Sequence, residues 1–178
     1  DLIYTIFTPL MHATGSLPSI LILSTLSGLF WFFGIHGDNM MSAVTTPITT
    51  AAIAANAEAM AAGQPLPYIY AGAMTAIFGG WLAGNCAMNI YLLLFAKSSR
   101  IRSLSKVAAV PAFFNIAEPY VFGLPEVLNL YFFIPSTICN ILNITVYYFL
   151  ASANIVGRVY ISMPFTTPAP LQAFLATG

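Results

Sequence analysis

One stretch of the sequence, residues 107–130 (VAAVPAFFNIAEPYVFGLPEVLNL), places a carboxylate and three prolines inside an otherwise apolar segment. Each proline lacks an N–H group and crowds the preceding turn, so one continuous helix is disfavoured. The carboxylate of Glu118 is costly within a bilayer unless protein or a water-filled cavity surrounds it, and broken backbone is tolerated there under the same condition. We therefore predict a re-entrant hairpin over residues 107–130, with its tip at residues 115–119 facing a polar cavity. The alternative is a spanning helix that is kinked at Pro119.

The composition is that of a membrane protein. Of the 178 residues, 59% are hydrophobic and 6% are charged, and the mean hydropathy is +0.86. A soluble domain carries about 25% charged residues. The formal net charge is zero, so the chain has no overall basic field that would attract nucleic acid.

Two uncharged runs have the length and composition of bilayer-spanning helices, residues 17–33 and residues 131–153. Residues 43–62 are rich in Ala and Thr and are too polar to face lipid, which predicts an amphipathic or bundle-buried helix with Pro47 in its first turn. Residues 68–95 form the longest apolar stretch, and its glycines permit close helix contact or a break into two pieces.

A histidine lies between two glycines in the segment from Gly34 to Asn39 (GIHGDN). Glycine allows an unwound backbone and the close approach of a ligand. Histidine is the side chain most easily set to exchange protons near neutral pH, which makes His36 a candidate site residue. The alternative is an interfacial histidine in a turn after a helix.

Four of the five Lys and Arg residues lie close together in residues 96–106, namely Lys97, Arg100, Arg102 and Lys106. The excess of positive charge in cytoplasmic loops predicts that this segment is a cytoplasmic loop. The same charge suits the docking of an acidic or phosphorylated partner, although topology alone explains it.

Residues 159–178 repeat the arrangement of the first predicted hairpin, because prolines flank Phe165, Thr166 and Thr167 and an apolar run follows. Two proline-interrupted segments with polar tips indicate a binding site built where broken helices meet. The patterns together predict an all-α membrane protein, with transmembrane helices, two re-entrant helical hairpins and an amphipathic helix.

The sequence offers no metal-binding cluster and no phosphate-cradling glycine loop, so we expect neither a metal nor another cofactor. Cys86 and Cys139 lie in apolar runs without ligand spacing, and we expect both to be buried free thiols.

Four long motifs carry a family resemblance: WFFGIHG at residues 31–37, LLLFAKS at 92–98, FNIAEPYVFGLPEVLN at 114–129 and MPFTTPAPLQAFLATG at 163–178. In this order they resemble the membrane-embedded enzyme IIC component of the phosphoenolpyruvate-dependent sugar phosphotransferase system, in its lactose/cellobiose/diacetylchitobiose family. The resemblance implies that residues 1–178 are a partial enzyme IIC domain, its C-terminal, substrate-binding half. Residues 159–178 would then be a truncated second hairpin.

The resemblance also implies roles for individual residues. The acidic residue of the Asn-x-x-Glu-Pro motif, Glu118, would bind sugar hydroxyls near the atom to be phosphorylated, and His36 would lie on the other side of the same hydroxyl. The implied substrate-binding set is Asn115, Phe165, Thr166, Thr167, Gly37 and Asn39. The family pattern usually has Trp where this chain has Phe165, so a sugar ring would stack there without an indole N–H.

The implied function is translocation of an oligosaccharide, a β-linked disaccharide, coupled to phosphorylation by a separate phosphorylated enzyme IIB that docks at the Lys97–Lys106 segment. The implied setting is the bacterial cytoplasmic membrane, spanned several times, with a homodimer when the protein is full length. Two alternatives stay open. One is an ion-coupled secondary transporter with Glu118 as its proton site, and the other is a non-catalytic membrane subunit.

Overall fold

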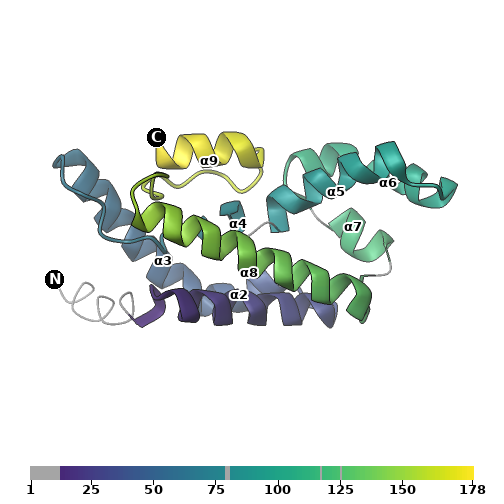
Figure 1. Ribbon diagram of the computed structural model, residues 1–178, viewed down its shortest axis with the longest axis horizontal. Helices are drawn as coiled ribbons and strands as arrows, with labels where there is room; N and C mark the ends of the chain where they lie inside the picture. Colours follow the sequence, from purple (N-terminus) through teal and green to yellow (C-terminus); the bar gives the residue numbers. More distant parts are fainter. Residues whose placement is uncertain (1–12, 79–80, 117, 125) are drawn as a thin grey trace.

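The computed structural model describes residues 13–178 except residues 79–80, 117 and 125, and within these residues the chain is helical with no β-strand. In chain order the helices are α2 (Leu17–Phe32), α3 (Gly37–Ala61), α4 (Met74–Phe78), α5 (Trp81–Phe95), α6 (Ser99–Phe113), α7 (Glu118–Gly123), α8 (Leu130–Ser152) and α9 (Ala169–Thr177). The predicted all-α class is confirmed. Helices α2, α3 and α8 lie together, α9 lies above α8, and α5, α6 and α7 gather at the other end (Figure 1).

Helix α8 matches the predicted span at residues 131–153. It has 23 residues, and among the described residues it is the helix long and apolar enough to cross a membrane. Helix α2 occupies the other predicted span but has 16 residues, against about 20 needed to cross the hydrocarbon core. Cys139 is exposed, because it lies on the outer face of α8, and Cys86 is partly exposed. The prediction that both thiols are buried is therefore wrong.

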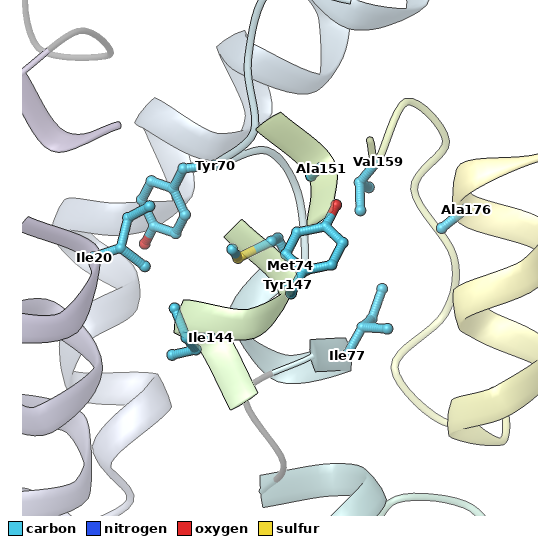
Figure 2. Packing of buried hydrophobic residues seen from close by; sticks show 9 residues of the cluster. All are labelled: Ile20, Tyr70, Met74, Ile77, Ile144, Tyr147, Ala151, Val159 and Ala176. Atoms are coloured by element: carbon cyan, nitrogen blue, oxygen red, sulfur yellow. The ribbon is translucent and has the colours of Figure 1, made fainter. Parts of the chain in front are cut away.

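The largest core lies where α2, α4, α8 and α9 meet. Met74 of α4 and Ile144 of α8 are fully buried there, and Tyr147 stacks on Phe78 with ring centroids 3.8 Å apart. Figure 2 shows side chains from all four helices and from two connecting segments converging on this point. The break between α4 and α5 follows the glycine-rich part of the predicted long apolar stretch, so the chain uses two helices there.

Helix α3 begins at Gly37, six residues before the predicted helix at residue 43, so Pro47 lies inside it and not in its first turn. The side chain of His36 caps the helix by accepting from the N–H of Asn39, which explains the earlier start. Farther along, Asn56 is fully buried: it donates to the carbonyls of Tyr68 and Val159 and accepts from the N–H of Tyr68. This bonding supports the bundle-buried reading of the helix.

The basic segment is mostly helix and not a loop, since α6 begins at Ser99. Lys97, Arg100, Arg102 and Lys106 are all exposed. Leu104 packs against the buried cluster of Ala108, Ala112, Tyr120 and Leu124 that joins α6 to α7. A helix with one apolar face and one basic face gives these residues a partner for each side, which explains why the segment is helical.

Both proline-interrupted segments turn back on themselves. Helix α6 ends at Phe113 and α7 begins at Glu118, so the alternative of one kinked helix is wrong. In the second segment, residues 159–168 lie outside any helix and run beside α9, with the N–H of Tyr160 donating to the carbonyl of Ala176. Whether either hairpin is re-entrant in a bilayer stays a prediction.

Candidate functional site

Two side chains that are far apart in the sequence meet at the centre of the candidate site. His36 lies at the N-terminus of α3 and Glu118 is the first residue of α7, and their atoms Nε2 and Oε1 are 3.7 Å apart. The two side chains keep 39% and 47% of their surface exposed, respectively. They therefore face open space, where a ligand can reach both.

The surroundings of His36 fix the direction of its proton. Its Nδ1 accepts from the N–H of Asn39 at 3.3 Å. In the neutral imidazole one nitrogen accepts while the other carries the proton, so Nε2 is the N–H that faces Glu118. Neutral His36 is thus a hydrogen-bond donor at this point, and the Glu118 carboxylate is the acceptor.

Asp38 supports His36 from below, and the sequence analysis did not select it. Its two oxygens accept from the hydroxyl of Ser27 at 2.9 Å and from the indole N–H of Trp31 at 3.3 Å. The imidazole of His36 lies against the Trp31 ring, with centroids 4.3 Å apart. The available signal was a carboxylate in the first turn of a helix, where the N-terminal dipole favours negative charge.

Gly37 lets α2 and α3 approach closely. A Cβ atom at this position would lie 2.0 Å from the carbonyl oxygen of Ser27, which no packed structure allows. Gly37 is itself buried, so its clearest role is to bring the N-terminus of α3 against α2. Its predicted contact with substrate stays a prediction.

Asn115 joins the tips of the two hairpins. Its side-chain amide donates to the carbonyl of Phe165 at 2.8 Å and also to that of Thr167. Its backbone φ is +64°, a left-handed conformation that Asn adopts more readily than most residues. The side chain is 4% exposed, and its Oδ1 has no hydrogen-bond partner within the described residues. Asn115 therefore positions residues 165–167 beside the tip that carries Glu118.

The remaining predicted residues lie around this centre. Phe165 is 65% exposed, and Thr166 and Thr167 are partly exposed in a turn closed by the Thr167 N–H and the Pro164 carbonyl. Asn39 and Phe165 line a cavity of about 430 Å³ between α2, α3 and the arm before α9. His36 and Glu118 are not among the residues that line it. They adjoin it through Asn39, whose N–H binds His36, and through Asn115, which binds Phe165.

The described residues contain no group of three or more His, Cys, Asp or Glu side chains that could hold a metal ion. The chemistry available at the site is therefore that of a carboxylate, an imidazole and several hydroxyl and amide groups. Such a set can orient a neutral hydroxyl compound and accept a proton from it.

Comparison with known proteins agrees with this site. The family model described as "Phosphotransferase system, EIIC" matches residues 1–139, so the chain belongs to the EIIC family of the phosphotransferase system. The resemblance seen in the sequence motifs is thereby confirmed. Proteins of this family are membrane permeases.

Two curated relatives cover nearly the whole chain. The lichenan permease IIC component of Bacillus subtilis (strain 168) is 34% identical over 174 residues, which are 96% of this chain and 38% of the relative. The lactose-specific EIICB component of Streptococcus mutans serotype c is 32% identical over 177 residues, which are 98% of this chain and 31% of the relative. The chain spans less than two fifths of the length of these relatives.

A solved structure shares the fold. The crystal structure of ChbC, the IIC component of the N,N'-diacetylchitobiose-specific phosphotransferase system, superimposes with a TM-score of 0.92 at 27% identity. The match covers 99% of this chain and 42% of ChbC. The helical arrangement described above is therefore that of an EIIC transporter.

Proposed function

We propose that this chain forms the sugar-binding part of a permease that moves a β-linked disaccharide across the bacterial cytoplasmic membrane and presents it for phosphorylation. The observation that carries the proposal is the approach of His36 Nε2 to within 3.7 Å of Glu118 Oε1 in an accessible setting. The relatives named for lichenan, lactose and diacetylchitobiose support an oligosaccharide substrate.

The pair suits one sugar hydroxyl. An oxygen atom can lie within hydrogen-bond distance, about 2.7–3.0 Å, of two atoms that are 3.7 Å apart. The hydroxyl would accept from the Nε2–H of His36 and donate to Glu118. These two bonds would aim the remaining lone pair of the hydroxyl oxygen away from both side chains, where a phosphoryl group can be attacked.

The proposed transfer has a simple balance of atoms. The sugar oxygen forms a bond to phosphorus while the S–P bond of a phosphocysteine on enzyme IIB breaks, and the cysteine leaves as a thiolate. Glu118 takes the hydroxyl proton as general base, a contribution worth about 10²–10⁴-fold in rate. His36 holds the oxygen in position throughout.

The exposed basic residues of the segment that starts at Lys97 support docking of phosphorylated enzyme IIB on the cytoplasmic side. Arg100 and Lys106 lie on α6, the helix that packs against the Glu118-bearing α7. The EIICB relative supports the pairing of the two components, since its name joins them in one protein. We further propose several membrane crossings and a homodimer for the full-length protein.

The proposal is tested with the intact protein in membrane vesicles that contain phosphorylated enzyme IIB and radiolabelled disaccharide. We expect sugar phosphate to form inside, and we expect uptake to survive a protonophore but to stop when the phosphoryl donor is withheld. Uptake of unmodified sugar that stops with the protonophore would instead establish the ion-coupled alternative. An intact, membrane-inserted protein that neither binds nor transports cellobiose, lactose or diacetylchitobiose would leave only the non-catalytic role.

A further inference from the structure

The cavity beside the His36–Glu118 pair is lined mainly by hydroxyl groups. It measures about 430 Å³, and nine serine and threonine side chains contribute to its wall. They come from α2, α3, α4 and the arm before α9: Ser24, Ser27, Ser42, Thr45, Thr46, Thr49, Thr50, Thr75 and Ser162. Such a wall suits a ligand that carries many hydroxyl groups of its own.

The charge of the cavity excludes anionic ligands. The described residues that line it include no Lys, Arg or His, and the single carboxylate is that of Asp38. Both oxygens of Asp38 already accept hydrogen bonds, from Ser27 and Trp31. A phosphate or carboxylate placed here would meet no cation to offset its desolvation, whereas a neutral sugar ring loses little.

The hydrogen-bonding state of α3 shows what the wall can offer. Thr45 and Thr49 donate to backbone carbonyls one turn earlier, so their oxygens are left as acceptors. Thr46 and Thr50 are exposed, lie four residues apart on one face, and have no printed partner within the described part of the chain. The wall can thus both accept from ligand hydroxyls and donate to them.

The cavity is continuous with the reacting centre through two hydrogen bonds. Asn39 lines it and binds Nδ1 of His36, while Phe165 lines it and receives the amide of Asn115. The ring of Phe165 is 65% exposed and provides an apolar surface on which a sugar ring can stack.

We propose that this cavity is a second-ring subsite. It takes the neutral, hydroxyl-bearing ring of a disaccharide whose other ring is held by His36 and Glu118, and Thr46 and Thr50 hold the second ring. The inference rests on the proposed function and adds to it the place of the non-reacting ring and the requirement that this ring be uncharged.

The test compares ligands of one and two rings. In the intact protein, Thr46→Val and Thr50→Val are combined, and the dissociation constants of cellobiose, lactose and the one-ring probe methyl β-glucoside are measured by calorimetry or competition. Losing two neutral hydrogen bonds predicts about tenfold weaker binding of the better disaccharide, with methyl β-glucoside changed less than twofold. Thr46→Ser with Thr50→Ser keeps the hydroxyls and should restore disaccharide binding.

The control is Thr25→Val, which makes the same change on α2 outside the cavity wall and should alter neither ligand. Equal weakening of one-ring and two-ring ligands by the valine pair, or no weakening of either, would overturn the second-ring subsite while leaving the proposed function standing. If the unaltered protein binds no sugar, the proposed function fails together with the subsite.

Discussion

The two hairpins look alike in the sequence but are held together by different means. The first, α6–α7, is stabilised by apolar packing around Tyr120 and presents a carboxylate at its tip. The second, residues 159–178, has a helix on one side only. Its extended arm is held by hydrogen bonds from Asn56 and by Arg158, which donates to the carbonyl of Leu66. The packed hairpin carries the chemistry, and the hydrogen-bonded hairpin forms the adjustable wall beside it.

The largest effect is expected at the tip of the packed hairpin. Glu118→Gln keeps the size of the side chain but removes the proton acceptor, so phosphorylation of sugar should fall by about 10²–10⁴-fold. Sugar affinity should change far less, because the amide still forms hydrogen bonds. The measurement is sugar phosphate formation with phosphorylated enzyme IIB, beside calorimetry. The matched control is Glu58→Gln on the exposed side of α3, which should leave the rate unchanged.

The next largest effect is expected where the two hairpins join. Asn115→Ala removes both hydrogen bonds to the carbonyls of Phe165 and Thr167 and places Ala in a left-handed conformation. The unpaired carbonyls cost about 1–3 kcal/mol each if they stay buried, and the backbone strain adds about 1–2 kcal/mol. We expect weaker sugar binding and faster proteolysis near residues 165–167. Asn115→Gly removes the strain but not the lost bonds, so a normal Asn115→Gly protein would show that the junction does not matter.

A smaller effect is expected behind His36. Gly37→Ala forces the N-terminus of α3 away from the Ser27 carbonyl and should cost about 1–3 kcal/mol in unfolding free energy. Because His36 precedes Gly37, phosphorylation should fall as well. Gly63→Ala introduces backbone strain in a loop where nothing lies within 4 Å of the new Cβ. It should lower the melting temperature slightly with no loss of phosphorylation, and an equal loss in both variants would separate Gly37 from the site.

The smallest effect is expected on the wall formed by the second hairpin. Phe165→Leu keeps an apolar side chain but removes the aromatic face, so sugar binding should weaken by about twofold to tenfold. Phe165→Trp should bind at least as well as the unaltered protein. Calorimetry with one disaccharide decides both, and unchanged affinity in Phe165→Leu would remove the ring from the binding surface.

Much of this arrangement was predictable because it follows from local rules. Uncharged runs predicted α8, and prolines predicted the interruption before Glu118. Long motifs predicted that His36 and Glu118 would converge. What the sequence did not reveal depends on contacts between distant segments. Asp38 matters because Trp31 and Ser27 reach it from another helix, and the hydroxyl-lined cavity exists because four elements meet.

The errors have the same origin. The basic segment was read as a loop from its charge, yet Leu104 and its neighbours find an apolar partner in α7 and draw the segment into a helix. The start of α3 was placed too late, because the capping bond of His36 cannot be seen in composition. The exposure of Cys139 depends on which face of α8 stays uncovered, and an apolar run does not reveal this.

The most direct test is a double-mutant cycle on the reacting pair, with His36→Ala, Glu118→Gln and the combined variant compared in phosphorylation of one disaccharide at saturating phosphorylated enzyme IIB. If both side chains hold the same hydroxyl, the second substitution should add little to the first, since groups acting as a unit are strongly non-additive. Losses that multiply independently in the double variant would mean that the two residues act on different atoms, and the shared-hydroxyl mechanism would be wrong.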